Sequence, residues 1–569
     1  MKISKDRTGA VDRPLLALLA AWAVFSVASI WLRPLWPVDE TRYAGVAWEM
    51  WLRGDFLVPY LNGEPYSHKP PLLFWLIQLG WGLFGVNDWW PRLVAPLCAF
   101  AAVPLLLKLE KLLWNEKQAQ SGFSIWVLFG SLLFAAFITL TMFDLLLMLC
   151  AMAGMIGVLN LSNQKRIPGL LWLGAGIGLG VLAKGPVILL HVLPAAVVAP
   201  WWAPAARRSP GRGYSLYYLD LLLGVLLGAA IALAWALPAG HFGGEEYRRA
   251  IFWGQTAGRV SESFAHRAPW WYYLPLLPVI FFPWFVWPRF WKGLLATDPR
   301  QQALKFLSAW LLLTLIGFSL VSGKQTKYLL PSLPAFALLA GYALARATPA
   351  APGPTALSRW WEMLPPAIGF LALPASLAYL RARPAALDLP EWAGDIPLWP
   401  IAILALAAPV LLLCWRKQTA TQVRVLAFTT LGTVAVLGAG VIPAFVPYGD
   451  PGPAARHLAA LQEARVPLAH LGKYHAQYNF AGRLRAPIEI LDAPEVKGWV
   501  AAHPAGQVIT VVRKRHDASN ANAAGAAIAA AEGGPATAEG GPEYQAPFRG
   551  AWVQVWRGAA LLVARPELR

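Results

Sequence analysis

Charged residues are scarce in this chain of 569 residues, of which Asp, Glu, Lys and Arg make up only 14%. Soluble globular proteins carry about 25% charged residues, so the deficit excludes an ordinary soluble protein for most of the chain. Hydrophobic residues account for 57% of the sequence. The composition therefore indicates a protein that lies largely within a membrane.

Cysteine is nearly absent as well. Cys98, Cys150 and Cys414 lie in apolar segments, and no spacing motif joins them. This excludes a disulfide framework and a cysteine metal cluster, and we interpret the three thiols as small core residues. The chain also lacks a soluble basic domain, so its net charge of +18 does not predict nucleic-acid binding. We expect that charge to set the membrane topology and to meet anionic lipid.

Long apolar runs are abundant. A helix needs about 20 residues to cross the hydrocarbon layer, and we count about thirteen candidate stretches. The 30 tryptophans fit aromatic belts at the two membrane–water interfaces. The sequence therefore predicts an all-α polytopic membrane domain. The stretches are 15–31, 93–114, 124–139, 143–159, 170–183, 187–202, 219–237, 272–291, 306–321, 329–345, 360–380, 398–415 and 425–446.

The cations at the ends of these stretches predict their direction. Positive residues stay in the cytoplasm, so the N-terminus is expected inside and Asp39 outside. The first stretch has no signal-peptide cleavage pattern and is expected to stay as a helix. The run 71–85 is short and contains Gly80 and Gly82, so we expect it to lie in the outer interface. The alternation leaves the C-terminus outside. The cations before the first stretch are Lys2, Lys5, Arg7 and Arg13.

Composition divides the chain into two parts. We expect a membrane domain over residues 1–447, with outer loops at 36–92 and 239–271, and a small outer α/β domain over 448–569. Strand-like runs at 507–512 and 552–556 support the second domain, and 560–563 is predicted to form a hairpin with the latter run. The segment 519–541 is rich in Ala and Gly and is expected to be a mobile loop.

Three carboxylates at the outer ends of helices are the candidate catalytic residues. Asp39 and Glu40 come just after the first stretch, and Asp144 begins another. Charges near hydrocarbon are costly unless they are solvated or paired. The alternative is that these acids only cap helix N-termini, with Arg42 pairing with them. Because all three are expected on one side of the membrane, we favour the functional interpretation.

The predicted outer side also carries many cations, contrary to the positive-inside rule. Lys184-Gly185-Pro186 forms a predicted tight turn where a ligand could approach closely, although such a lysine usually extends to the interface. Arg and Lys are the usual partners of phosphate, so the set predicts a phosphate pocket. The set is Arg42, Lys69, Lys184, Arg248, Arg249, Arg259, Arg267, Lys324 and Lys327.

Two histidines are weaker candidates. His68 and His266 lie in separate outer loops and could hold a divalent ion such as zinc if those loops meet. A lone histidine at an interface is more often a hydrogen-bonded structural residue. We therefore predict no obligatory cofactor.

Several strings resemble the GT-C glycosyltransferases that use lipid-phosphate sugars and, within that group, the lipid A aminoarabinose transferases (ArnT). The resemblance covers about residues 15–346. One departure is His68, where the family often has Glu before the Lys-Pro pair. The strings are PVDETRYA at 37–44, Lys69-Pro70, LAKG at 182–185, HRAPWWYY at 266–273 and SGK at 322–324.

The resemblance implies a GT-C enzyme of about 13 helices with a periplasmic C-terminal domain. It would move 4-amino-4-deoxy-L-arabinose from undecaprenyl phosphate to lipid A phosphates at the periplasmic face of the bacterial inner membrane, which confers polymyxin resistance. It implies Asp39 as the catalytic carboxylate, assisted by Asp144 and Glu40. We expect a monomer. The residues expected to bind the donor are Arg42, Tyr43, Lys69, Lys184, Arg259, Arg267, Lys324 and Tyr328.

Two other functions stay open. A related GT-C enzyme could transfer a mannosyl or galacturonosyl group to protein or lipid, because the acidic start is shared. A transporter of lipid-linked sugars is a different class, but transporters place charged groups near the midplane. Here the charges lie at the ends of the stretches, with His191 as the main exception.

Overall fold

The computed structural model describes residues 13–114, 123–203, 214–254, 267–347, 360–383, 391–513, 541–549 and 551–568. Contacts within the chain define two compact units. The first comprises Met1–Ile30, Ser67–Ser376 and Trp399–Leu437, and the second comprises Trp31–Tyr66, Leu377–Leu398 and Gly438–Arg569. The predicted domain boundary after residue 447 stays a prediction, and the two units are described separately.

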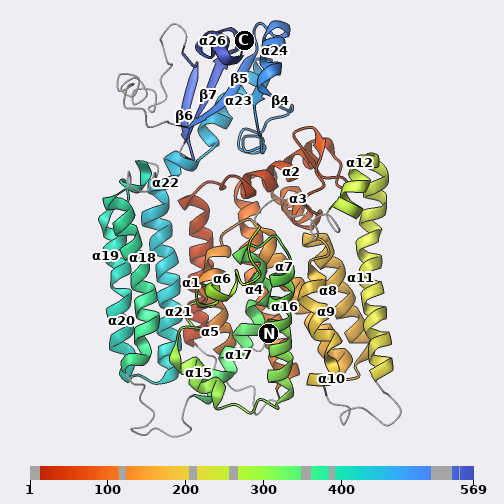
Figure 1. Ribbon diagram of the computed structural model, residues 1–569, viewed down its shortest axis with the longest axis vertical. Coiled ribbons are helices and arrows are strands. Elements are labelled where there is room, and N and C mark those ends of the chain that lie inside the picture. Colours follow the sequence, from red (N-terminus) through yellow and green to blue (C-terminus); the bar gives the residue numbers. More distant parts are fainter. Residues whose placement is uncertain are drawn as a thin grey trace. The chain divides into compact units, whose positions relative to one another are not determined.

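The first unit is a bundle of apolar helices (Figure 1). Among the described residues of the whole chain, ten helices are long and apolar enough to span a membrane, so the predicted multi-pass membrane fold is confirmed. The first-unit helices begin with α1 (Arg13–Leu32), α3 (Leu72–Phe84), α4 (Trp89–Leu113), α5 (Phe123–Phe129), α6 (Leu132–Phe137), α7 (Phe143–Ser162), α8 (Arg166–Lys184), α9 (Ile188–Val197), α10 (Ala199–Trp202), α11 (Tyr214–Phe242) and α12 (Gly244–Arg249).

The remaining elements of this unit complete the bundle. They are η2 (Ala250–Gly254), η3 (Leu274–Leu276), α14 (Leu277–Ile280), α15 (Pro288–Leu295), α16 (Gln302–Leu320), η4 (Thr326–Ser332), α17 (Leu333–Arg346), η6 (Trp360–Met363), α18 (Leu364–Ala382), α19 (Leu398–Ala405), α20 (Ala407–Leu413), η9 (Cys414–Arg416) and α21 (Thr419–Val436). The last residues of α18 and the first of α19 belong to the second unit.

Three predicted spans are interrupted. The stretch 272–291 forms only short turns and the helices α14 and α15, because prolines at 275, 278, 283 and 288 remove backbone donors. Prolines at 194 and 200 lie in the stretch 187–202, which divides into α9 and α10. The stretch 124–139 breaks at Gly130 into α5 and α6. A Cβ at Gly130 would lie 2.7 Å from the Trp284 ring, so this break lets another segment pack closely.

The run 71–85 contains a single helix of 13 residues, α3. A helix of that length is shorter than the hydrocarbon layer, which agrees with the prediction that it is not a span. Its predicted place in the outer interface stays a prediction.

Close packing of α7 against α8 is the feature of the bundle that positions the site. Small residues let two helix backbones approach in a membrane. A Cβ on Gly176 would lie 2.3 Å from the backbone nitrogen of Gly154, and one on Gly157 would lie 2.4 Å from that of Leu173. The two helices are consecutive and joined by a short turn, so this contact sets the start of α7 beside the end of α8.

The second unit contains an α/β domain, as predicted. Its sheet has five strands in the order β4-β3-β5-β7-β6. β3 (Leu468–Leu471) is parallel to β4 (Glu489–Leu491) and to β5 (Gln507–Arg513), while β7 (Ala551–Arg557) is antiparallel to β5 and to β6 (Tyr544–Phe548).

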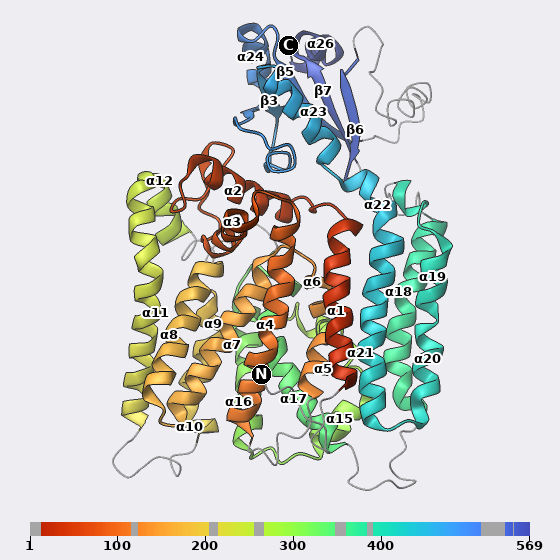
Figure 2. The same ribbon diagram turned by 180° about the vertical axis from the view of Figure 1, so that it is seen from behind.

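Helices cover both faces of this sheet (Figure 2). Side chains alternate along a strand, so Ile509 packs with Leu458 of α23 (Gly452–Glu463), while its neighbour Val508 packs with Trp499 of α24 (Val496–Ala502). The other elements of the unit are α2 (Asp39–Arg53), β1 (Tyr60–Leu61), β2 (Glu64–Pro65), η8 (Glu391–Ala393), η10 (Leu437–Val441), α22 (Ile442–Gly449), η11 (Ala493–Glu495), α26 (Gly558–Ala564) and η12 (Pro566–Leu568).

The predicted hairpin of 560–563 with β7 is wrong. Residues 558–564 form the helix α26, and the hairpin partner of β7 is β6. Leu561 is buried against Val508 and Trp556, so an apolar helical face explains the run better than a strand. The predicted mobile loop at 519–541 lies outside the described residues, except for Gly541.

The hairpin β1–β2 is tied to the C-terminal domain within this unit. The Asn62 side chain donates to the carbonyl of Ile488 at 2.8 Å and accepts from its N–H at 2.9 Å. Asn62 has a φ of 55°, and asparagine tolerates this left-handed conformation better than most residues. One side chain therefore joins segments that are 426 residues apart.

We expect Asn62→Ala to lower the stability of the second unit by about 1–3 kcal/mol, because two buried backbone groups lose their partner. Thermal unfolding of the full chain in detergent measures the effect. Asn62→Gly is the matched control, because glycine accepts the positive φ but still removes both hydrogen bonds. A glycine variant as stable as the wild type would show that the hydrogen bonds contribute nothing.

Candidate functional site

Asp144 and Lys184 form a buried ion pair in the first unit. Asp144 lies in the first turn of α7, Lys184 is the last residue of α8, and Lys184 Nζ donates to Asp144 Oδ1 at 2.6 Å. Their side chains are 2% and 11% exposed. The N-cap of α7 is Met142, so Asp144 is not its capping residue. The glycine contact between α7 and α8 explains why the two charges meet.

The turn after Lys184 also fits a binding role. Gly185 has a φ of 82°, and a Cβ placed there would meet no atom within 4 Å. Left-handed backbone favours glycine, so this residue both closes the turn and leaves space beside the ion pair. Lys184 Nζ also lies 5.1 Å from the centre of the Tyr328 ring.

Lys69 approaches the same place from another segment. Its Nζ lies 5.8 Å from the centre of the Phe143 ring, next to Asp144 in the chain. The structure therefore brings Lys184 to Asp144 and Tyr328, and it places Lys69 near Phe143. These residues come from the segment before α3 and from α7, α8 and η4.

Lys324 holds a loop in place. It is 4% exposed, and its ammonium donates to the carbonyl oxygens of Ala268 and Val321. Arg267 forms an isolated β-bridge with Gly323, so Lys324 fixes the backbone that carries Arg267. Burial lowers the pKa of Lys324, while the two carbonyl oxygens that accept from its ammonium favour the charged form. The exposed side chain of Arg267 is better placed to reach a ligand.

The adjacent acids Asp39 and Glu40 have different environments in the second unit. Glu40 pairs with Arg33, both side chains are 3% exposed, and Glu40 also accepts from the Trp36 N–H at 2.9 Å. Asp39 pairs with Arg42 one turn later, and its side chain is 34% exposed. The N-cap of α2 is Val38, which argues against the capping interpretation. The geometry favours a structural role for Glu40 and leaves Asp39 accessible to a substrate.

Arg42 and Tyr43 complete this acidic end of α2. The guanidinium of Arg42 lies 5.6 Å from the centre of the Tyr43 ring, and Tyr43 is buried. The predicted residues thus fall into two sets, one in each unit. That all of them share one side of a membrane stays a prediction.

The metal-site prediction is not tested by this structure. Among the described residues, no group of three or more His, Cys, Asp or Glu side chains could hold a metal ion. His68 is exposed. His266 lies outside the described residues, as does the predicted donor ligand Arg259.

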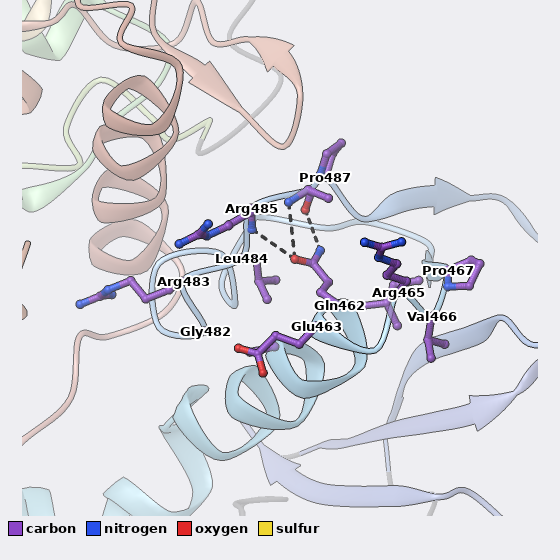
Figure 3. A pocket seen from close by; sticks show the side chains of 13 residues that line it. Gln462, Glu463, Arg465, Val466, Pro467, Gly482, Arg483, Leu484, Arg485 and Pro487 are labelled. Carbon is purple, nitrogen blue, oxygen red and sulfur yellow. Dashed lines mark hydrogen bonds between the residues drawn. The ribbon is translucent and has the colours of Figure 1, made fainter.

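Sequence reasoning missed Arg33, the partner of Glu40, although a cation seven residues before an acid is a visible signal. It also missed His475, whose charged surroundings include Asp39 and Arg42. No local signal could have found His475, because it lies in a different domain of the sequence. A third unpredicted feature is a cavity of about 550 Å³ in the second unit, and Figure 3 shows the side chains that line it.

Arginines line this cavity together with one glutamine. Gln462 accepts from the Arg485 N–H and donates to the Ala486 carbonyl, so its side chain fixes the backbone of two residues that line the cavity. Figure 3 shows Arg483 pointing away from Gln462, and its guanidinium lies 3.8 Å from the centre of the Phe480 ring. Arg465 and Arg485 are exposed at the cavity.

Comparison with known proteins gives a family. Residues 68–235 match the family model described as dolichyl-phosphate-mannose-protein mannosyltransferase. The undecaprenyl phosphate-alpha-4-amino-4-deoxy-L-arabinose arabinosyl transferase of Pseudomonas aeruginosa (strain UCBPP-PA14) is 32% identical over 64% of this chain and 65% of its own length. Transferase 1 of Pseudomonas fluorescens (strain Pf-5) is 31% identical over 66% of this chain and 67% of its own. The chain belongs to this transferase family.

Solved structures agree on the fold. ArnT from Cupriavidus metallidurans bound to undecaprenyl phosphate has a TM-score of 0.71 and 20% identity, covering 95% of this chain and 97% of that one. Its apo state gives a TM-score of 0.69. The predicted GT-C type of membrane fold with a C-terminal α/β domain is therefore confirmed. The match to the first Pseudomonas aeruginosa relative spans 65% of its length, just under two thirds.

We expect single substitutions of the Asp144–Lys184 pair to be strongly destabilising, by roughly 3–5 kcal/mol, because each leaves a buried charge without a partner. Lys184→Met should be worse than Asp144→Asn, since the remaining lysine can move its ammonium towards water. Thermal unfolding in detergent measures both.

The double variant Asp144→Asn with Lys184→Met is the control, because it leaves no uncompensated charge. It should regain most of the lost stability. If its loss equals the sum of the two single losses, the pair is not coupled and the two residues act independently.

Proposed function

We propose that this chain is an integral membrane glycosyltransferase that moves 4-amino-4-deoxy-L-arabinose from undecaprenyl phosphate to a phosphate group of lipid A. The names of the relatives in this family support the sugar and its carrier. The observation that carries the proposal is the buried pairing of Lys184 with Asp144 in the first unit, with Lys69 near the adjoining Phe143 ring. Charged groups at the ends of apolar helices suit a phosphate that is attached to a lipid chain.

The cations suit a lipid phosphate. A phosphate beside hydrocarbon needs several charge-assisted hydrogen bonds to offset its desolvation. Lys184 pairs with Asp144, Lys69 lies near the ring of the neighbouring Phe143, and Lys324 fixes the backbone beside the exposed Arg267. Lys69, Lys184 and Arg267 would bind the donor phosphate and stabilise the charge that it gains as it leaves.

The reaction that we propose is a direct displacement at the sugar. An oxygen of the acceptor phosphate bonds to C1, and the bond from C1 to the donor phosphate oxygen breaks. The electron pair of that bond leaves with undecaprenyl phosphate. The acceptor is already anionic, so the step needs no strong general base.

Asp39 then has a role other than deprotonating the acceptor. A carboxylate repels an acceptor phosphate but attracts the ammonium group of an aminopentose. Its ion pair with Arg42 and its partial exposure support a carboxylate that stays charged and meets substrate. We therefore assign Asp39 to orienting the sugar through its ammonium group.

We further propose that the enzyme is a monomer of the bacterial inner membrane and that its site and C-terminal domain face the periplasm. The flipped donor and lipid A are both available on that face. Modified lipid A binds cationic peptides less well, so the activity would confer polymyxin resistance. The mannosyltransferase model that matches residues 68–235 favours transfer of another sugar as the second candidate.

Mass spectrometry of lipid A from cells with and without this chain tests the function. We expect aminopentose on the lipid A phosphates only when the chain is present. Asp39→Asn should abolish this addition at normal protein levels, because the charge that holds the sugar is lost. Glu40→Gln should lower protein stability more than specific activity, since it weakens the buried pair with Arg33. Normal addition by Asp39→Asn would exclude a role for this acid.

The orientation can be tested separately. A reporter enzyme that works only in the cytoplasm, fused after Arg569, should be silent, because the alternation of charge places the C-terminus outside. The same reporter fused before Met1 should be active. Strong activity of the C-terminal fusion would overturn the proposed topology.

A further inference from the structure

One face of α2 packs against the segment between β3 and β4 within the second unit. Arg42, Gly45 and Trp48 are three residues apart and so lie on the same face of the helix. A Cβ on Gly45 would lie 3.4 Å from the carbonyl oxygen of Ala476. Trp48 Nε1 donates to the Leu484 carbonyl at 2.9 Å. Glycine at position 45 thus lets the two backbones come into contact.

This contact places His475 beside Arg42. His475 precedes Ala476, and Arg42 lies one helical turn before Gly45. The electrostatics agree: partial burial lowers the pKa of His475, and the charges of Arg42, Arg549 and Lys473 lower it further, while Asp39 acts in the opposite direction. Cations from α2, from the loop after β3 and from the turn after β6 therefore all lie close enough to His475 to affect its pKa.

The side chains that the C-terminal domain contributes around His475 are accessible. Lys473, His475 and Arg549 are exposed. Within the part of the chain that the structure describes, their side chains form no ion pair and no hydrogen bond to another side chain. Asp39, the carboxylate that acts on the pKa of His475, is already paired with Arg42. The cluster therefore has an excess of positive charge, which an anionic ligand would balance.

The position in the sheet also suits a ligand. The segment that carries Lys473 and His475 follows the carboxyl end of β3, which is parallel to both of its neighbours. After β3 the chain continues to β4, which pairs with one edge of β3, while β5 pairs with the opposite edge. Ligands of open α/β sheets bind at such points, where the strand order reverses.

We propose that Lys473, His475 and Arg549, together with Arg42, bind the phosphate of the acceptor lipid next to Asp39. The C-terminal domain is then part of the substrate site and selects phosphorylated acceptors. This inference rests on the proposed transfer to a lipid phosphate. It assigns the donor phosphate to the cations of the membrane unit and the acceptor phosphate to this second cluster.

Direct binding by the purified full chain tests the assignment. The probes are bisphosphorylated lipid A, the same lipid A after enzymatic removal of both phosphates, and undecaprenyl phosphate, each in mixed micelles. The wild type should prefer the phosphorylated lipid A. Lys473→Ala and Arg549→Ala should each bind it about 10-fold more weakly, as expected for the loss of a charge-assisted hydrogen bond, with unchanged binding of undecaprenyl phosphate.

Two variants serve as controls. Lys497→Ala removes an exposed cation of α24 in the same domain and should bind like the wild type. Lys473→Arg keeps the charge and should restore most of the affinity. Because these side chains are exposed, the variants should unfold at the wild-type temperature, which separates binding from folding.

Several results would overturn the inference. They are equal binding of both lipid A forms by the wild type, wild-type affinity in both alanine variants, an equal loss in Lys497→Ala, or a parallel loss of undecaprenyl phosphate binding. A transfer assay separates this inference from the proposed function. If the function is wrong, the wild type transfers no sugar. If only the inference is wrong, the wild type transfers, and the variants keep its KM for the acceptor.

Discussion

The buried ion pair between Asp144 and Lys184 is the interaction on which the membrane part of the site depends. Two charges beside hydrocarbon are tolerated because each neutralises the other. The pair forms because Gly154 and Gly176 let α7 and α8 pack backbone to backbone. The ion pair therefore depends on the packing of the two helices, because a larger residue at the glycine contact would separate the charges.

Adjacent acids with unequal burial are the second organising feature. Glu40 is enclosed by Arg33 and the Trp36 N–H, which fixes the start of α2. Asp39 precedes Glu40 by one residue, so it lies on a different face of the helix, and its side chain stays partly exposed. A buried, paired carboxylate can serve as an anchor, while its neighbour remains charged and available. The helix face that follows, with Gly45 and Trp48, binds the C-terminal domain.

Much of the fold could be predicted from local signals, and the errors have local causes. The prolines of the stretch 272–291 were visible and should have excluded a continuous helix. The short apolar run at 560–563 fits a strand or a buried helix equally well, and only its packing on Val508 and Trp556 distinguishes them. By contrast, β5 and β7 are rich in β-branched and aromatic residues and were correctly predicted.

The sequence by itself determined the membrane class, the α/β character of the C-terminal domain and the family strings, because apolar length and residue order are local properties. Only the tertiary structure decided that Lys184 pairs with Asp144, that Glu40 is enclosed by Arg33, and that His475 lies near Arg42. Partners such as Trp48 and Leu484 are 436 residues apart. Their contact depends on how whole elements pack, and no local pattern in either segment specifies it.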